Sequence, residues 1–190
     1  MRNNLRILIV LFFVCSCKTE SDKEYLFSER ENTNITFNNT LDNSEELHIL
    51  NYLYFYNGAG VASADFNNDG LSDIYFTGNK VADKLYLNRG ELHFEDVTDK
   101  ALINNPQSWT TGVTVADVNQ DGLLDIYVCK VSKHLDLKGH NLLYINQGIN
   151  DNGIPQFKEE SKTFGLNFSG YSTQSVFFDY DLDGDLDMNL

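Results

Sequence analysis

Three nine-residue stretches carry oxygen-bearing side chains at one spacing, and they are the residues of this sequence best suited to chemistry. They read DFNNDGLSD at residues 65–73, DVNQDGLLD at 117–125 and DYDLDGDLD at 179–187. Each has Asp or Asn at positions 1, 3, 5 and 9, and Gly at position 6. A single stretch of this kind is common in turns, but three with the same spacing indicate an internal repeat.

This spacing suits a calcium ion, which takes six to eight oxygen ligands at about 2.3–2.6 Å. Side chains at positions 1, 3 and 5 of a tight loop can converge on one point, and Gly at position 6 allows a sharp turn with positive φ. A main-chain carbonyl at position 7 and a carboxylate at position 9 then complete the shell. The predicted ligands are Asp65, Asn67, Asp69, the carbonyl of Leu71 and Asp73 in the first loop; Asp117, Asn119, Asp121, the carbonyl of Leu123 and Asp125 in the second; and Asp179, Asp181, Asp183, the carbonyl of Asp185 and Asp187 in the third.

Two other interpretations of these stretches are weaker. An EF-hand needs a bidentate Glu at position 12 and flanking helices, but position 12 is Phe76, Val128 and Leu190. Asp-Gly stretches also form ordinary hairpin turns. However, three, three and five carboxylates at such short range repel one another unless a cation compensates them. We therefore expect about three Ca²⁺ sites, each in a loop between β-strands.

The acidic composition narrows the possible partners. The formal net charge of the 190-residue chain is −14, and 11 of its 28 acidic residues lie in the three loops. Nucleic acid is not expected as a partner, because its phosphates require a basic protein surface. The 13 Phe and 10 Tyr beside only 2 Pro favour a β-rich core.

The runs around the loops predict four-stranded repeats. The strands expected in the first repeat are 60–64, 73–78, 84–88 and 92–97, and those in the second are 112–116, 125–130, 141–146 and 156–160. A third repeat begins at Ser172. Four antiparallel strands at this period are typical of a β-propeller blade. The predicted fold is therefore all-β, a partial β-propeller of four-stranded antiparallel blades with calcium loops between the first two strands.

These repeats set the predicted domain boundaries. Blade 1 covers 58–104 and blade 2 covers 105–168. Residues 169–190 form the start of a truncated blade 3. Residues 25–57 are expected to hold N-terminal strands, at 26–29 and 35–37, which act as a propeller clasp. We also expect the chain to be the N-terminal piece of a longer protein or a truncated gene product, with exposed blade edges that favour aggregation.

The first 24 residues have the features of an export signal. Arg2 and Arg6 accompany the apolar run 5–14, which is too short to span a membrane as a mature helix. It leads to Ser16-Cys17, which resembles a bacterial lipobox. The prediction is a lipoprotein signal peptide at 1–16, lipidation of Cys17 and a tether at 17–24, with an ordinary secretory signal as the alternative. The protein would then be exported and lipid-anchored in the bacterial outer membrane or at the cell surface, touching the membrane through that anchor only.

Other residues could do chemistry but have simpler explanations. Cys129 lies in an apolar strand and is expected to be a small core residue. His134, Asp136 and His140 could hold zinc, although without helical spacing we favour ordinary loop histidines.

An aromatic set could line a sugar or peptide groove, but core packing is favoured for it: Trp109, Tyr52, Tyr54 and Tyr56. No Ser-His-Asp order, G-x-S-x-G motif or phosphate-binding glycine loop is present, so we expect that the protein is not an enzyme.

The loops resemble FG-GAP/VCBS repeats, the type that builds the integrin α-subunit propeller. More specifically, residues 56–79, 84–88 and 94–98 are similar to bacterial proteins related to cartilage acidic protein, the ASPIC/UnbV group. The resemblance covers roughly residues 25–190. It implies a calcium-stabilised propeller outside the cytoplasm that binds or scaffolds a protein or glycan, and the lipobox adds a likeness to envelope lipoproteins of the Bacteroidetes type.

This sequence also departs from that family pattern. The literal Phe-Gly and Gly-Ala-Pro signatures are absent, and the ASPIC/UnbV module itself normally lies C-terminal, beyond this chain. The alternative function is a propeller platform of a hydrolase or lyase that acts on polysaccharide.

Overall fold

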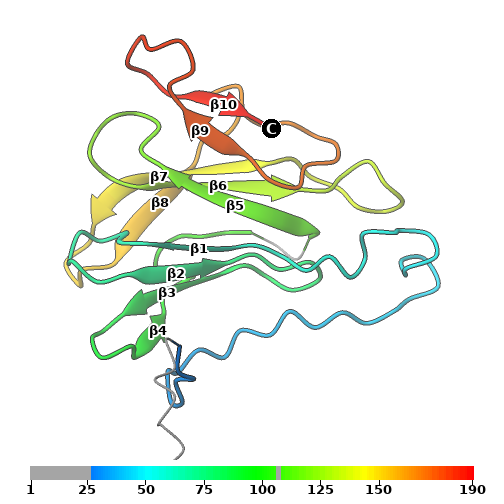
Figure 1. Cartoon of the computed structure of the whole chain (residues 1–190), viewed down its shortest axis with the longest axis horizontal. Helices are drawn as coiled ribbons and strands as arrows, with labels where there is room; N and C mark the ends of the chain where they lie inside the picture. The colour runs from blue at the N-terminus through cyan, green and yellow to red at the C-terminus, as the bar shows by residue number, and fades with distance from the viewer. Residues whose placement is uncertain (1–26, 106–107) are drawn as a thin grey trace, which may run out of the picture. The chain divides into compact units, whose positions relative to one another are not determined.

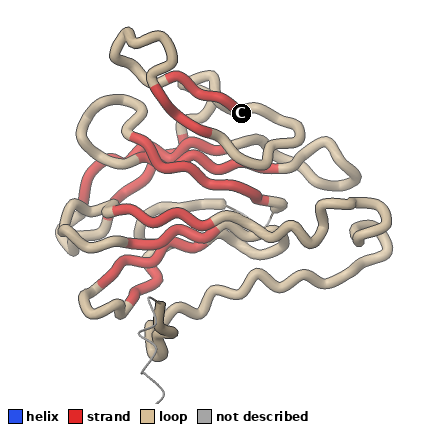
Figure 2. The backbone as a smooth tube through the Cα atoms, viewed as in Figure 1, coloured by secondary structure: helices blue, strands red, loops and turns tan. Residues whose placement is uncertain are grey.

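The computed structural model describes residues 27–105 and 108–190. The predicted signal peptide at 1–16, the lipidated Cys17 and the tether at 17–24 lie outside the described residues. Residues 1–31 and 32–190 form separate units, and the fold below is that of the second. The described part of the chain contains no helix with the length and hydropathy that a membrane crossing needs, and Figure 2 shows it built from strands and loops.

In the part of the chain that the structure describes, ten strands form two complete antiparallel sheets and a hairpin (Figure 1). In chain order the first sheet has strands β1 to β4, the second has β5 to β8, and the hairpin pairs β9 with β10. This arrangement confirms the all-β prediction and its four-stranded antiparallel repeats. The strands are β1 Val61–Ala64, β2 Asp73–Phe76, β3 Lys84–Asn88, β4 Phe94–Asp96, β5 Thr110–Ala116, β6 Asp125–Lys130, β7 Leu142–Ile149, β8 Pro155–Glu159, β9 Val176–Phe178 and β10 Asp187–Asn189.

The second sheet is buried on both faces. Every residue of β6 is buried, and its alternating side chains enter two different cores. Ile126 and Val128 join the core shared with the first sheet, whereas Tyr127 and Cys129 pack with Phe177 and Met188 of the hairpin. The four central residues of β6 are therefore all hydrophobic, because the first sheet covers one of its faces and the hairpin covers the other.

The largest core fills the space between the two complete sheets. Tyr75, Leu85 and Leu87 of the first sheet meet Ile126 and Tyr144 of the second, and all five are at most 1% exposed. Phe66 from the first loop enters the same core, so the loop is anchored by an apolar side chain. The repeats thus depend on each other for burial, as blades that stack side by side do.

The first strands of the three repeats, β1, β5 and β9, are called the inner strands here, and they approach each other closely enough to require glycine. Strand β1 lies beside β5, and β5 lies beside β9. A Cβ on Gly112 would stand 2.3 Å from the carbonyl oxygen of Thr173, and one on Gly60 would stand 2.7 Å from that of Thr111. At these two positions the main chain of the neighbouring repeat leaves no room for a Cβ atom.

Threonine hydroxyl groups also form hydrogen bonds between neighbouring repeats. Thr77 Oγ1 donates to the carbonyl of Thr111 at 2.6 Å. Thr111 Oγ1 in turn donates to the carbonyl of Ser172 at 2.7 Å. Side chain to main chain bonds thus link each sheet to the next.

Residues 27–60 contain no strand, so the predictions at 26–29 and 35–37 are wrong for the residues that are described. The segment 32–42 instead runs over the outer face of the first sheet. Phe37 stacks on Phe76 with ring centroids 4.9 Å apart, and the Asn39 amide donates to Asn79 Oδ1 at 2.8 Å. These side-chain contacts and one main-chain bond, from the Phe94 N–H to the Thr33 carbonyl at 2.9 Å, hold the segment without a strand ladder, which is why the apolar alternation was misleading. Its role as a clasp stays a prediction.

Candidate metal centre

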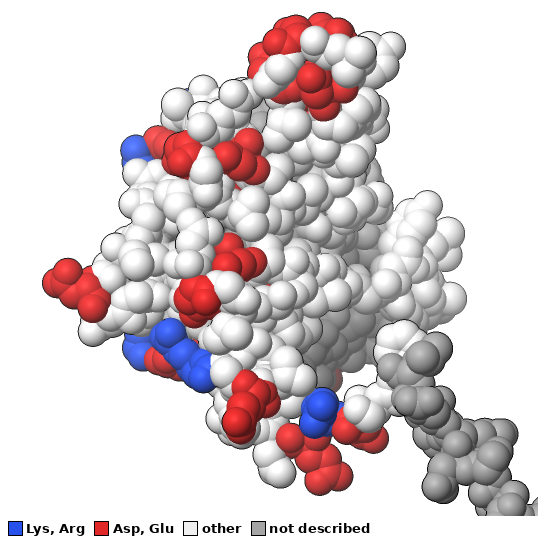
Figure 3. All heavy atoms as spheres, turned by 60° about the vertical axis from the view of Figure 1, so that its left-hand side comes forward, with Lys and Arg blue, Asp and Glu red and all other residues white. Residues whose placement is uncertain are grey.

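All three acidic loops join the first two strands of their repeat, as predicted. They connect β1 to β2, β5 to β6 and β9 to β10, and in Figure 1 they lie along one side of the sheets. Figure 3 shows this side coming forward, with acidic side chains gathered in separate clusters. The glycine at position 6 has positive φ in each loop, at Gly70, Gly122 and Gly184.

The first two loops have the same internal hydrogen bonds. Asp65 accepts from the backbone N–H groups of Asp69 at 3.1 Å and Gly70 at 2.8 Å. Asp69 accepts from the N–H of Leu71 at 2.9 Å and from the Asn67 amide at 2.9 Å. In the second loop the corresponding bonds have lengths of 2.8–3.1 Å, with Asp117, Asn119, Asp121, Gly122 and Leu123 in the same roles.

The carboxylate at position 9 is buried and linked to two elements. Asp73 is 0% exposed; its Oδ2 accepts the N–H of Phe66 at 3.0 Å, and its Oδ1 accepts that of Asn88 at 2.8 Å. Burial raises the pKa of Asp73 to about 6, although these two N–H donors oppose the shift. Asp125 repeats the arrangement, and burial raises its pKa as well.

An asparagine on the third strand of each repeat, Asn88 at the end of β3 and Asn146 within β7, donates hydrogen bonds to these two loops, and the sequence analysis did not assign it a role. The Asn88 side chain donates to the carbonyl of Ser72 at 3.2 Å. Asn146 donates to the carbonyls of Phe66 at 2.9 Å and Leu124 at 3.3 Å. The signal that could have found it is the asparagine that ends both KLYLN and LLYIN.

The third loop differs because its carboxylates converge. One oxygen from each of Asp179, Asp181 and Asp187 lies within 4.8 Å of the others, and within the described ranges no other group of three acidic, His or Cys side chains does so. Asp179 Oδ1 is buried and has no hydrogen-bond partner. The neighbouring Asp183 carboxylate raises the pKa of Asp185. An unsatisfied buried oxygen beside two more carboxylates is a donor set that fits a hard divalent cation.

The first two loops offer fewer free oxygens. In each of them all six carboxylate oxygens accept a hydrogen bond from the protein itself. The predicted ligands therefore lie in the predicted loops, but only the third loop gathers three of its carboxylates within the stated distance.

The alternative zinc residues do not come together. His134 uses one ring nitrogen with the carbonyl of Asn51 at 3.1 Å and the other with the Tyr171 hydroxyl at 2.8 Å. His140 Nδ1 lies 2.8 Å from the carbonyl of Asn141. These contacts leave His134 without a free ring nitrogen for a metal.

Cys129 and two of the four aromatic candidates are core residues. Cys129 is 0% exposed, and burial raises the pKa of its thiol to about 11. Tyr52 and Trp109 are buried in a small apolar cluster. In contrast, Tyr54 and Tyr56 are 57% and 59% exposed.

Comparison with known proteins identifies the type of repeat. Residues 65–128, which run from the first loop into β6, match the family model of the FG-GAP-like repeat. The chain is 26% identical over 177 residues to cartilage acidic protein 1 of Mus musculus, and this match covers 92% of this chain and 26% of that protein. It is 30% identical over 136 residues to cartilage acidic protein 1 of Homo sapiens, and this match covers 70% of this chain and 20% of that protein. The chain thus spans about a quarter or less of these relatives, and the resemblance to FG-GAP repeats is confirmed.

Proposed function

We propose that this chain, which carries an FG-GAP-like repeat, is a calcium-dependent binding module of an exported, lipid-anchored protein. It would present a β-propeller-like surface to a protein or glycan and catalyse nothing itself. Ca²⁺ would be held by the loops that join the first two strands of each repeat. Export and anchoring rest on residues 1–17, and Cys17 would carry the lipid.

The observation that carries the calcium proposal is the third loop. Three carboxylates bring oxygens within 4.8 Å of one another, and the buried Asp179 Oδ1 has no donor. Like charges at this range destabilise the loop, and a buried acceptor without a donor adds a desolvation cost. A bound Ca²⁺ removes both costs, so metal binding and folding of the hairpin would be coupled.

We expect the three loops to differ in affinity. The third loop has five carboxylates, whereas the first two have three each, with Asn67 and Asn119 at position 3. In the first two loops protein N–H groups already occupy the carboxylate oxygens. Since affinity depends on the charge and rigidity of the ligand set, the third loop should bind most tightly.

The structure offers a specific probe of the third loop. Tyr180, at its second position, is 76% exposed, whereas the first two loops have Phe66 and Val118 there. Terbium luminescence sensitised by tyrosine should therefore come mainly from this loop and be displaced by Ca²⁺. Tyr180→Phe should remove most of the signal without removing Ca²⁺ binding.

The affinity test compares two single-charge variants. Asp181→Asn should weaken Ca²⁺ binding to the third loop by at least about tenfold, because it removes one of the converging ligand charges. Asp151→Asn, at an exposed acidic residue outside the loops, should leave the affinity unchanged. Equal Ca²⁺ affinity in wild type and Asp181→Asn would contradict the proposed site.

Calcium should also raise the melting temperature of the chain, since a ligand that binds only the folded state stabilises it by mass action. A chelator should reverse the increase. A melting temperature that does not respond to Ca²⁺ would contradict the coupling between metal and fold.

A further inference from the structure

We propose that a pocket at the N-terminal ends of the inner strands binds a neutral carbohydrate. This inference builds on the proposed binding function and names the ligand class and the site. The pocket has a volume of about 270 Å³. It lies where the chain enters β1, β5 and β9, whereas the acidic loops lie at the opposite ends of the same strands.

The pocket carries no charge. Its eleven lining residues include no Lys, Arg, His, Asp or Glu. In a chain with a net charge of −14, a neutral pocket excludes ligands that need a counter-charge, such as phosphates and acidic sugars. The ligand it can accept is uncharged and able to make both apolar and hydrogen-bonding contacts.

One wall of the pocket is aromatic, and buried rings support its exposed ring. Trp109 and Tyr52 are buried and meet edge to face, with ring centroids 5.2 Å apart. Tyr52 supports Tyr54 at 5.9 Å, and Tyr54 keeps 57% of its surface exposed. A pyranose ring has an apolar C–H face, and an exposed, supported aromatic ring is a suitable surface for it.

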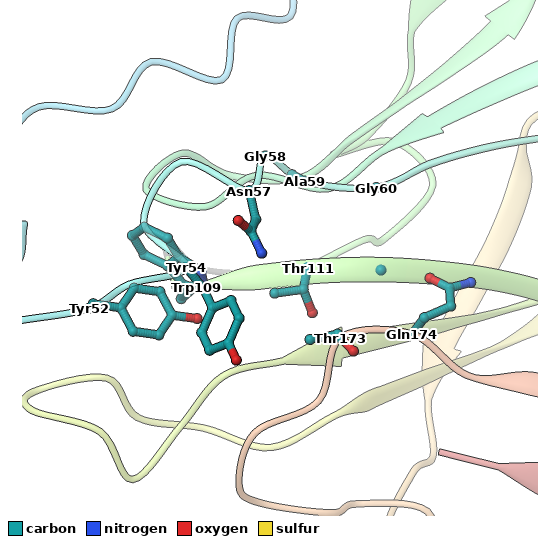
Figure 4. Close-up of a pocket in the computed structure, with 11 residues that line it drawn as sticks. Tyr52, Tyr54, Asn57, Gly58, Ala59, Gly60, Trp109, Thr111, Thr173 and Gln174 are labelled. Atoms are coloured by element: carbon teal, nitrogen blue, oxygen red, sulfur yellow. The ribbon is translucent and has the colours of Figure 1, made fainter. Parts of the chain in front are cut away.

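The other side of the pocket offers hydrogen-bonding groups. Among the described residues, the side chains of Asn57 and Thr173 have no hydrogen-bond partner, and Figure 4 shows the Asn57 amide pointing into the pocket. Gln174 is held by its amide nitrogen, which donates to the carbonyl of Val113 at 3.2 Å and to Thr114 Oγ1 at 3.1 Å. Its Oε1 lies over Gly112, where an added Cβ would stand only 2.0 Å away. A preorganised acceptor and two free polar side chains are suited to sugar hydroxyls.

The same aromatic and amide groups could also recognise a peptide, but the shape of the pocket favours a sugar. Proline-rich peptides lie along extended grooves lined by several aromatic rings. Here Tyr54 is the one strongly exposed ring on the wall, and the nearby exposed Tyr56 does not line the pocket. The volume is slightly below the range of about 300–1,000 Å³ found for drug-sized ligands, so the site suits one or two sugar units.

The test uses the 190-residue chain in calcium buffer with neutral saccharides, observed by ligand-detected NMR. The probes are glucose, galactose, mannose, N-acetylglucosamine and their β-linked disaccharides, with a proline-rich decapeptide as the competing class. We expect at least one saccharide to bind, and its binding to weaken at least tenfold in Tyr54→Ala and in Asn57→Ala. Tyr56→Ala, which changes an exposed tyrosine outside the pocket, should bind the saccharide as wild type does.

Folding is checked for each variant by its melting temperature, so that loss of binding is not confused with unfolding. Binding of none of the saccharides by folded protein, equal binding by Tyr54→Ala, or binding of the peptide alone would overturn the inference. Saccharide binding that persists when the Ca²⁺ titration shows no metal would support this inference while contradicting the calcium part of the proposed function.

Discussion

Asp73 Oδ1 accepts the backbone N–H of Asn88 at 2.8 Å, which joins the end of the first acidic loop to the end of the third strand. Asp125 and Asn146 make the same bond at 2.8 Å in the second repeat. The acid at position 9 therefore stabilises the fold independently of any metal, because it connects the acidic loop to the third strand of its sheet. This explains why it is buried in both complete repeats.

Asn146→Ala should destabilise the protein by about 2–3 kcal/mol, because it leaves buried main-chain groups without partners. Asn146 is 1% exposed, donates to Phe66 and Leu124, and accepts from the N–H of Gly148 at 3.0 Å. Its exposed neighbour provides the matched control, and Gln147→Ala should change the free energy of unfolding little. Urea denaturation measures both, and equal effects would show that Asn146 has no special role.

Asp83→Ala should cost about 3–5 kcal/mol, because several buried donors lose their acceptor together. The Asp83 carboxylate is 2% exposed and accepts from Tyr75 Oη at 3.0 Å, the N–H of Gly78 at 2.9 Å and Thr110 Oγ1 at 2.7 Å, as well as from Asn105. The control is Asp99→Ala, at an exposed acidic residue. Thermal or urea unfolding that gives the same stability for both variants would contradict this assignment.

Gly112→Ala should destabilise the chain by about 1–3 kcal/mol through overpacking between inner strands. The added Cβ would meet both the Gln174 side chain and the main-chain oxygen of Thr173. The double variant with Gln174→Ala relieves only the first clash, so it should recover little of the lost stability. Full recovery in the double variant would show that the main-chain approach is not the limiting contact.

The Cys129 thiol should make stability fall as the pH rises from about 9 to about 11. Burial raises its folded-state pKa from 9.0 to about 11, so the unfolded chain loses this proton first and is favoured at high pH. The difference between the two pKa values corresponds to about 2–3 kcal/mol. Denaturation of wild type and Cys129→Ala across this range isolates the effect, because only the wild type should show the additional slope. Parallel curves would count against a buried thiol.

Spacing and composition were enough to predict the repeated part of the fold. The acid and glycine positions located all three turns, because a tight loop needs positive φ at its sixth residue, as Gly70, Gly122 and Gly184 have. The strand bounds at 84–88 and 125–130 agree with β3 and β6, since turn residues end each apolar run. The strand prediction at 35–37 failed because Phe37 is only partly buried and packs by stacking on Phe76 rather than by joining a ladder.

The sequence by itself determined where the acidic loops lie and which segments form sheets, because both depend on residues close together in the chain. Only the tertiary structure decided how those loops differ: the carboxylates of Asp179, Asp181 and Asp187 converge in the third, while Asn88 and Asn146 donate to main-chain carbonyls of the first two. It also placed Tyr54, Asn57 and Gln174 around one pocket. The asparagine contacts and the pocket join residues that lie up to 80 and more positions apart in the chain, and long-range packing, which no local spacing encodes, brings them together.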